Sequence, residues 1–244
     1  MTEASLQVDW APLILAVAPN GARKTQADHP AVPISPAELA ATAAAAQAAG
    51  AAMIHLHVRD GAQQHSLDVG AYREATAAVR EAVGDRIVIQ VTSEAVGIYN
   101  ANQQRAMVRA LEPEAVSLAI RELIPDESEE DAAREFLAWL TGAGILPQYI
   151  LYAPEDVARF GRLQAEGVIP EAPGFLLFVL GRYTPGQRSV PNDLLPYLAE
   201  IQAWPEAARL PWAICAFGPK ETACVTAAAT LGGHARVGFE NNLY

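Results

Sequence analysis

Short apolar segments alternate with helix-like segments along almost the whole chain, which is the pattern of a parallel α/β fold. We expect eight strands, at residues 13–18, 53–58, 87–92, 115–119, 146–152, 175–180, 212–217 and 235–239. Seven helices are expected between them, at residues 36–49, 69–83, 101–110, 129–141, 155–166, 192–204 and 221–231. Such a series in 244 residues predicts a (β/α)8 TIM barrel. An open doubly wound sheet is the main alternative, but no GxGxxG or Walker loop follows the first strand.

The first predicted helix has the clearest boundaries. Ser35 supplies an N-cap, Pro36 occupies the first helical position, and Glu38 completes a capping box. Gly50 lies just past the end of the helix. These signals indicate a packed helix in a segment whose alanine content alone would suggest low complexity.

The sequence stops at Tyr244, directly after the eighth expected strand, so the eighth helix of the barrel is expected to be absent from this chain. Either the chain is a shortened barrel, or a partner subunit covers the open side. For this reason we expect a homo-oligomer. No linker or shift in composition divides the chain, so residues 1–244 are expected to form one catalytic domain.

The composition excludes several classes of partner. A formal net charge of −11 argues against nucleic acid, and no basic cluster suggests a membrane surface. Apolar runs are too short to span a bilayer, and residues 1–12 do not resemble a signal peptide, so we expect a cytoplasmic protein. Cys215 and Cys224 form no CxxC motif, and we expect both to be buried thiols.

His55 and His57 lie two residues apart in an apolar segment that is expected to form a strand. Side chains at this spacing on a strand point to the same face, whereas on a helix they would diverge. Two converging imidazoles are a common way to hold a divalent metal, and Zn²⁺ is the first candidate. A pair of hydrogen-bonded core histidines is the alternative.

The active site of a TIM barrel lies at the carboxyl ends of its strands. Strand 8 of such a barrel neighbours strand 1, which neighbours strand 2, so Glu240 can reach the two histidines. Two histidines and a glutamate form a three-ligand site with open positions, as in catalytic zinc centres. The other polar residues expected at these ends are Asn20, Thr92, Ser93, Glu94, Arg121, Glu122, Arg182, Lys220, Arg236 and Asn241.

Several motifs resemble those of the β-keto acid cleavage enzymes, whose type member is the 3-keto-5-aminohexanoate cleavage enzyme. The similarity covers essentially the whole chain, and its HxH and GGHxRxGxE blocks are specific in combination. The segments that carry it are residues 18–23, 29–38, 50–60, 91–97 and 232–242.

The resemblance implies a zinc-dependent enzyme that converts a β-keto carboxylate and acetyl-CoA to acetoacetate and an acyl-CoA. It implies that His55, His57 and Glu240 are the zinc ligands and that Arg236 is the active-site arginine. Zn²⁺ would polarise the keto group, and a base would remove a proton from the carbon between the two carbonyl groups. That carbon would attack the thioester before the old carbon–carbon bond breaks, in a retro-Claisen step. Arg236 would offset the negative charge that develops.

Thr92 and Ser93 stand where the family has polar residues that handle the substrate. Asn20 follows the first expected strand and is expected to contact the substrate, as is Asn241.

Two substitutions distinguish this chain from the family's type member. Asn241 stands where the type enzyme has an aspartate that is thought to be its base, and an amide cannot abstract a proton. Glu94 or Glu122 could supply the missing carboxylate, although either could be a salt-bridged surface residue. Arg23 replaces an acidic residue taken to recognise the substrate's amino group, so we expect a neutral or anionic substrate. Arg23 could also point to solvent.

Two loops are candidates for binding the phosphates of CoA, at residues 181–188 and 218–220. His29, His65 and His234 are expected to be structural or exposed to solvent. Two alternative functions remain open at this stage. One is a zinc-dependent aldolase or hydrolase that needs no CoA, and the other is a degenerate homologue that binds metal or keto acid without turnover.

Overall fold

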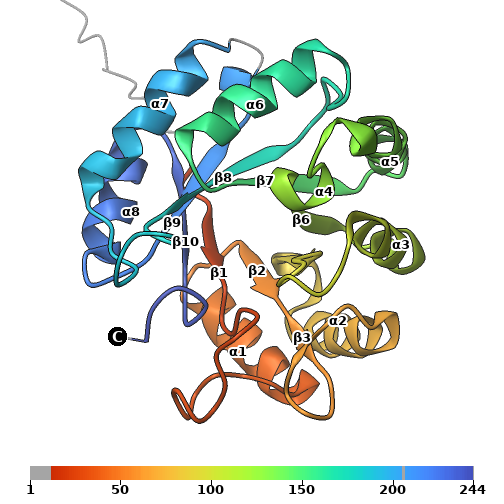
Figure 1. The fold of residues 1–244 in the computed structure, drawn as a ribbon. Coiled ribbons are helices and arrows are strands. Elements are labelled where there is room, and N and C mark those ends of the chain that lie inside the picture. The colour runs from red at the N-terminus through yellow and green to blue at the C-terminus, as the bar shows by residue number, and fades with distance from the viewer. Residues whose placement is uncertain (1–11, 205–206, 244) are drawn as a thin grey trace, which may run out of the picture.

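The computed structural model describes residues 12–204 and 207–243. Eight parallel strands close into a barrel, in the order β1, β10, β9, β8, β7, β6, β5 and β2 (Figure 1). The strands are β1 (Leu15–Val17), β2 (Met53–Leu56), β5 (Val88–Thr92), β6 (Ala115–Ala119), β7 (Leu146–Leu151), β8 (Phe175–Leu180), β9 (Trp212–Ala216) and β10 (His234–Val237). The TIM barrel that the alternating pattern predicts is therefore confirmed.

The helices form a ring outside the barrel (Figure 1). They are α1 (Pro36–Ala48), α2 (Val69–Val83), α3 (Ala101–Leu111), α4 (Ile120–Leu123), α5 (Glu130–Gly142), α6 (Pro154–Ala165), α7 (Leu195–Gln202) and α8 (Glu221–Thr230). Short 3-10 turns occur at η1 (Gly84–Arg86), η2 (Glu127–Glu129), η3 (Pro191–Leu194) and η4 (Ala207–Arg209). The helix expected at residues 192–204 is thus a 3-10 turn followed by α7, and the one-turn helix α4 has no counterpart among the predictions.

The capping box of α1 is present as predicted. The Glu38 N–H donates to Ser35 Oγ at 3.3 Å, and the Ser35 N–H donates to Glu38 Oε2 at 2.9 Å. These two hydrogen bonds satisfy backbone donors that the first turn of a helix leaves free. The backbone N–H groups of Ser35 and Ile34 both donate to Glu38 Oε2, and they hold the pKa of Glu38 at about 2, well below its ordinary value.

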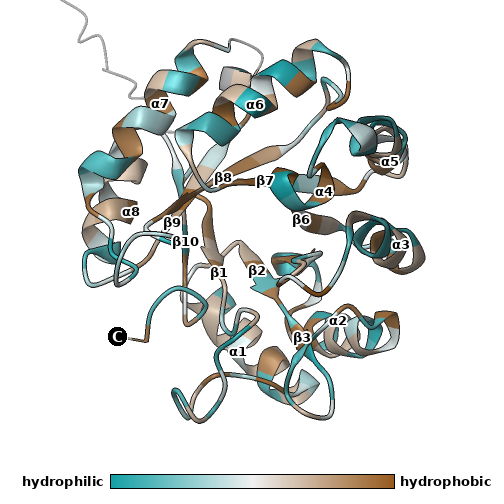
Figure 2. Cartoon of the chain, viewed as in Figure 1, coloured by the Kyte–Doolittle hydropathy of each residue, from teal (hydrophilic) through white to brown (hydrophobic). Residues whose placement is uncertain are grey.

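Two apolar regions stabilise the fold. The larger one lies between the outer face of the barrel and the helices, and includes Leu118, Phe136 and Phe160. The smaller one lies inside the barrel, and includes Leu177 and Cys215. Figure 2 shows the hydrophobic strands, notably β7 and β8, surrounded by helices that carry both hydrophobic and hydrophilic residues. Burial of these apolar surfaces is the main favourable contribution to folding.

A polar layer lies inside the barrel beside the apolar one. Gln90, Thr92, Ser117 and Gln148 are all buried, and they belong to the consecutive strands β5, β6 and β7. Inward-facing residues alternate along each strand, so these side chains belong to the barrel interior rather than to the helix-covered face. This layer supports the side chains at the carboxyl ends of the strands.

The strand predicted at residues 53–58 is shorter than expected. β2 ends at Leu56, and β3 (Val58–Arg59) turns away to pair antiparallel with β4 (His65–Ser66). Asp60 accepts hydrogen bonds from the N–H groups of Ala62 and Gln64, which closes the turn of this hairpin. His57 therefore lies between two strands and not within one.

The barrel closes through β1 and β10, where Leu15 pairs with Ala235. Residues 238–243, which follow β10, form turns and irregular structure. Tyr244 lies outside the described residues. No helix in the described ranges is both long and apolar enough to cross a membrane.

Candidate metal centre and cavity

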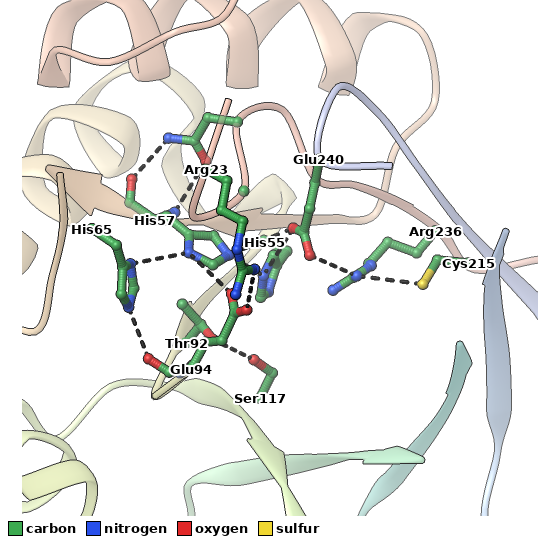
Figure 3. Close-up of polar contacts among 12 residues, drawn as sticks. Arg23, His55, His57, His65, Thr92, Glu94, Ser117, Cys215, Arg236 and Glu240 are labelled. Atoms are coloured by element: carbon green, nitrogen blue, oxygen red, sulfur yellow. Dashed lines mark hydrogen bonds and ion pairs between the residues drawn. The ribbon is translucent and has the colours of Figure 1, made fainter. Parts of the chain in front are cut away.

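Three side chains with metal-binding atoms meet at the carboxyl end of the barrel (Figure 3). His55 is in β2, His57 directly follows this strand, and Glu240 follows β10. The Nε2 atoms of the two histidines are 3.0 Å apart. Glu240 Oε2 is 3.3 Å from His55 Nε2 and 3.6 Å from His57 Nε2. These three residues, called the metal centre below, thus have ligand atoms within 4.8 Å of one another.

The Nε2 atom of His55 is free to bind a cation. The buried His55 ring has its Nδ1 atom 2.8 Å from Gln90 Oε1 on the neighbouring strand β5. An amide oxygen only accepts hydrogen bonds, so Nδ1 carries the proton and Nε2 of the neutral ring has a lone pair. Gln90 therefore fixes the tautomer and orientation of His55, as outer partners of metal-binding histidines commonly do.

His65 fixes the tautomer of His57 in a similar way. His65 Nε2 lies 2.8 Å from the backbone oxygen of Glu94, so Nε2 carries the proton of this ring. Burial lowers the pKa of His65 to about 4, so the ring is neutral near pH 7 and its Nδ1 accepts. His57 Nδ1 lies 3.4 Å from that atom and must donate. Burial lowers the pKa of His57 to about 4 as well, which leaves a lone pair on its Nε2.

Two imidazole lone pairs and a carboxylate oxygen therefore face one another. Glu240 Oε2 has no hydrogen-bond partner in the described part of the chain. Burial would raise the pKa of Glu240, but the positive charge of Arg236 outweighs this effect and the pKa lies well below its usual value. Facing electron pairs repel unless a cation lies among them, and two imidazoles with one carboxylate suit zinc.

Two close backbone approaches place Glu240 at this point. Gly238 has a φ of 138°, and a Cβ atom there would lie 2.3 Å from Ala18 O. The Glu240 N–H then donates to the same Ala18 oxygen at 3.0 Å. Gly21 has a φ of 63°, and a Cβ atom there would lie 2.5 Å from Glu240 Cγ. The loops after β1 and β10 thus pack together only because both positions are glycine.

Asn20 holds His57 from the other side. Its Nδ2 donates to the backbone oxygen of His57 at 2.9 Å, and its Oδ1 accepts from the His57 N–H at 3.2 Å. Asn20 is fully buried and also belongs to the lining of the cavity described next. The hydrogen bonds of Asn20 thus hold the backbone of His57, and its predicted contact with the substrate stays a prediction.

A cavity opens beside the metal centre. Its apolar wall comes from β7, β8 and the residue after β9, and includes Ile150, Val179 and Phe217. Cationic side chains outnumber carboxylates in the rest of the lining. The charged lining residues are Arg23, Lys24, Glu94, Arg182, Arg236 and Glu240.

Arg236 contacts the metal centre and lines the cavity. Its Nη2 atom donates to Glu240 Oε1 at 2.9 Å and lies 3.4 Å from Cys215 Sγ. Its Nε and Nη1 groups have no hydrogen-bond partner among the described residues. Burial disfavours the charge of Arg236, but Glu240 and Cys215 outweigh this, so its pKa is raised. Arg236 thus forms an ion pair with Glu240 and also keeps two unpartnered donor groups within the described residues.

Glu94 and Arg23 form an ion pair at the edge of the cavity, with Oε1 and Nη1 3.2 Å apart (Figure 3). Glu94 Oε2 is 3.9 Å from His57 Nδ1, so this carboxylate lies beside the metal centre. The Arg23 side chain is 55% exposed, yet it belongs to the cavity lining. Glu94 is the only lining carboxylate besides Glu240 in the described part of the chain.

Thr92 and Ser93 do not line this cavity. Thr92 Oγ1 accepts from the Glu94 N–H at 3.1 Å and from the Ser117 hydroxyl at 3.0 Å. The Ser93 hydroxyl donates to the Ser117 backbone oxygen at 3.3 Å. Both residues thus stabilise the turn that carries Glu94.

Glu122 is also outside the cavity lining. Its Oε2 atom accepts from the Ala95 N–H at 2.9 Å, and its pKa is raised because burial disfavours the charge. Asn241 is buried, and neither of its amide atoms has a hydrogen-bond partner in the described ranges. It is likewise not part of the lining.

The two loops expected to bind phosphate differ in their availability. Arg182 lines the cavity and lies over Phe217, with 5.4 Å between the guanidinium carbon and the ring centre. The Gly218 N–H donates to Asn242 Oδ1 at 2.6 Å, so this backbone donor is already used. The first loop therefore offers the better anion contact.

No sequence pattern indicates the role of Gln90 or the place of Tyr152 in the cavity lining, and only a weak one indicates the role of His65. His65 was expected to be structural or exposed, and it is in fact buried against a metal-centre residue. Gln90 acts through His55, which is on another strand and distant in sequence. An HxH motif with a third histidine in the following hairpin was the available, weak signal for His65.

The chain matches known proteins over most of its length. A family model described as beta-keto acid cleavage enzyme matches residues 12–244. A 3-keto-5-aminohexanoate cleavage enzyme of Fusobacterium nucleatum is 31% identical, over 95% of this chain and 83% of that protein. A 3-oxoadipate:acetyl-CoA acetyltransferase of Cupriavidus necator is 26% identical, over 95% and 81%.

Solved structures share the barrel. A ternary complex of ObcA with a C4-CoA adduct and oxalate has a TM-score of 0.64 and 16% identity, covering 88% of this chain and 58% of that chain. The 3-dehydroquinate dehydratase of Enterococcus faecalis has a TM-score of 0.58 and 12% identity, covering 95% and 90%. These two similarities concern the fold alone. The family match is of another kind, because it spans nearly every residue, and this chain therefore belongs to the beta-keto acid cleavage enzyme family and is an enzyme of that class.

Proposed function

We propose that this enzyme converts a β-keto carboxylate and acetyl-CoA to acetoacetate and the CoA ester of the remaining acyl group. The observation that carries this proposal is the convergence of two imidazole lone pairs and one carboxylate beside a cavity with surplus positive charge. The names of relatives support it, since the Cupriavidus necator protein is an acetyl-CoA acetyltransferase. A Rhizobium meliloti relative, 28% identical, is a 3-dehydrocarnitine:acetyl-CoA trimethylamine transferase.

His55, His57 and Glu240 would hold a divalent metal, with zinc as the expected ion. When bound, this ion supplies Lewis-acid polarisation of a keto oxygen and acidifies the neighbouring carbon. Gln90 and His65 keep the two ligand nitrogens unprotonated and correctly oriented.

Arg236 would bind the substrate carboxylate. Its Nε and Nη1 groups are buried and unpartnered in the described part of the chain, and a carboxylate matches two guanidinium N–H groups. The ion pair between Nη2 and Glu240 Oε1 fixes the plane of the guanidinium beside the metal centre. The substrate would thus be oriented by the same residue that stabilises a ligand.

Glu94 would be the general base in place of the aspartate that the family's type member has at position 241. It lines the cavity beside His57, whereas Glu122 is engaged by a backbone N–H outside the lining. The carboxylate would take a proton from the carbon between the two carbonyl groups. Its ion pair with Arg23 orients the carboxylate.

The bonds then exchange in two steps. The deprotonated carbon attacks the acetyl carbonyl carbon of acetyl-CoA, a carbon–carbon bond forms, and the CoA thiolate leaves. The thiolate attacks the original keto carbon, and the bond to the transferred carbon breaks. The electron pair of that bond returns to the carbon of acetoacetate, which takes a proton. No redox step occurs.

The charges around the cavity favour a neutral or anionic side chain on the keto acid. Lys24 and Arg182 have no carboxylate partner within the described ranges. Mutual repulsion with Arg182 contributes to a lowered pKa of Lys24, after the larger effect of burial. An additional cationic group on the substrate would therefore be repelled, and an anionic group would be attracted. Arg182 would also be available to a CoA phosphate.

The test is an assay of acetoacetate release from acetyl-CoA by zinc-loaded protein, with cationic, neutral and anionic β-keto acids of similar size. We expect turnover with neutral or anionic members and at least about tenfold lower kcat/KM with cationic ones. Cleavage that proceeds without acetyl-CoA would instead identify an aldolase or hydrolase. No turnover over the panel, in folded protein with one bound zinc, would contradict the proposal.

A further inference from the structure

Tyr152 directly follows β7 at the carboxyl end of the barrel and belongs to the cavity lining. β7 is four strands from β1 in both directions round the closed barrel. The metal centre lies on β2 and after β10, the two neighbours of β1. Tyr152 therefore approaches the cavity from the side opposite the metal centre.

The hydroxyl of Tyr152 is a free donor in the described part of the chain, and Tyr152 lines the same cavity as the charged side chains. No residue in the described ranges forms a hydrogen bond with this hydroxyl. Its oxygen is also not among the buried polar atoms that lack a partner. Burial, followed by the charges of Glu94, Glu122 and Glu240, raises its pKa well above the usual value. The hydroxyl thus stays protonated and can donate a hydrogen bond.

The ring of Tyr152 is held from behind by a separate set of contacts. The Arg121 guanidinium carbon lies 4.8 Å from the ring centre, and the Tyr183 ring lies 5.4 Å away. Arg121 is paired with Asp156, which also accepts the Tyr152 N–H at 2.7 Å. Because this carboxylate neutralises Arg121, the cation serves to position the ring rather than to bind an anionic substrate.

In the proposed function the metal centre would bind the keto oxygen and Arg236 the substrate carboxylate. A donor fixed like Tyr152 would therefore suit a further oxygen. In the proposed reaction, that oxygen is the acetyl carbonyl oxygen of acetyl-CoA, which becomes negatively charged when the keto acid carbon attacks. A preoriented neutral donor stabilises such charge more than it stabilises the ground state. We propose that Tyr152 is a catalytic residue whose hydroxyl donates a hydrogen bond to this acetyl oxygen. This inference rests on the proposed function.

The first test compares Tyr152→Phe with Tyr149→Phe. Tyr149 is on the same strand, but it packs in the outer core against Phe160 and does not line the cavity. We expect Tyr152→Phe to lower kcat and kcat/KM by about 100-fold, as loss of one oxyanion donor does. Tyr149→Phe should stay within about twofold of the original protein. Cobalt substitution should give the same absorption spectrum in all three proteins, which would exclude a change at the metal centre.

A second measurement does not depend on turnover. The acetyl oxygen of acetyl-CoA becomes the keto oxygen of acetoacetate, so the product retains the group that Tyr152 contacts. Calorimetry with acetoacetate and zinc-loaded protein should show about fivefold weaker binding to Tyr152→Phe and no change for Tyr149→Phe.

The outcomes separate this inference from the proposed function. If the original protein shows no turnover but Tyr152→Phe binds acetoacetate more weakly than it does, the proposed contact of Tyr152 stands and the proposed cleavage reaction is rejected. Turnover and acetoacetate affinity within twofold of the original protein would overturn the role of Tyr152. An equal loss in Tyr149→Phe would also overturn it, because the effect would then come from packing.

Discussion

At the level of single residues, the chemistry of this site depends on which nitrogen of each imidazole carries a proton. Gln90 accepts from His55 Nδ1, and His65 accepts from His57 Nδ1, so both Nε2 atoms present lone pairs toward Glu240. The tautomers, and not only the spacing, therefore make the pair of histidines competent for metal binding.

Gln90→Ala is expected to weaken metal affinity by about 10–100-fold, because His55 loses the partner that fixes its tautomer and orientation. Competition with a chelating dye measures this affinity. Gln148→Ala is the matched control, since Gln148 is equally buried in the barrel but contacts no metal-centre residue. Equal losses in the two variants would attribute the effect to the barrel interior and contradict the role of Gln90.

Glu94→Gln is expected to lower kcat by about 10²–10⁴-fold while the zinc content stays at one per chain, because the amide cannot act as base. Steady-state kinetics and metal analysis measure the two quantities. Glu122→Gln should have little effect, since an amide oxygen can still accept the Ala95 N–H. If Glu122→Gln abolished turnover and Glu94→Gln did not, the assignment of the base would be wrong.

The sequence could predict that His55, His57 and Glu240 converge, because HxH spacing and the position of Glu240 carry the information, and metal binding by them stays a prediction. It could not place the side chains of Thr92 and Ser93, although their position at the end of a strand was right. Neighbouring residues on an extended chain point to opposite sides, so both could not face the cavity. Gln90 and Tyr152 had no local signal, because their roles arise from neighbours on other strands.

At the level of elements, α1 shows how a local signal defines a boundary. Ser35 and Glu38 exchange hydrogen bonds across the first turn, and the helix begins at Pro36 as predicted. The hairpin of β3 and β4 shows the converse. Two-residue strands contain no periodic pattern, so the sequence could not indicate that the chain leaves the barrel after Leu56.

Glu38→Ala is expected to lower the free energy of unfolding by about 0.5 kcal/mol near neutral pH, since solvent screens this exposed carboxylate. The folded pKa is about 2, below the ordinary value of 4.5. A depressed acid pKa stabilises the folded state fully above pH 4.5, and this contribution is lost as the pH falls toward 2. The difference between variant and original protein should therefore shrink over that range in denaturant titrations.

Glu81→Ala is the control for this experiment, because Glu81 is exposed in α2 and caps no helix. Its effect on stability should be near zero and should not follow the same course with pH. A Glu38→Ala effect that persisted unchanged down to pH 2 would show that the carboxylate charge does not contribute to the cap.

At the level of the whole molecule, the barrel brings the ends of the chain together to build the site. β2, from the first quarter of the sequence, and β10, from its end, both neighbour β1, so His55 and His57 meet Glu240. The alternation of strands and helices was sufficient to predict this arrangement. The oligomeric state stays a prediction, because nothing in one chain measures association.

The most direct test of the central claim is a zinc titration of metal-free protein while acetoacetate formation from acetyl-CoA and the best β-keto acid is recorded. The account predicts that activity rises in proportion to added zinc and stops rising at one equivalent per chain. His55→Ala should bind zinc at least about 100-fold more weakly and stay inactive at that equivalent. Full turnover by the metal-free protein, or stoichiometric zinc binding that is unchanged in His55→Ala, would contradict the account.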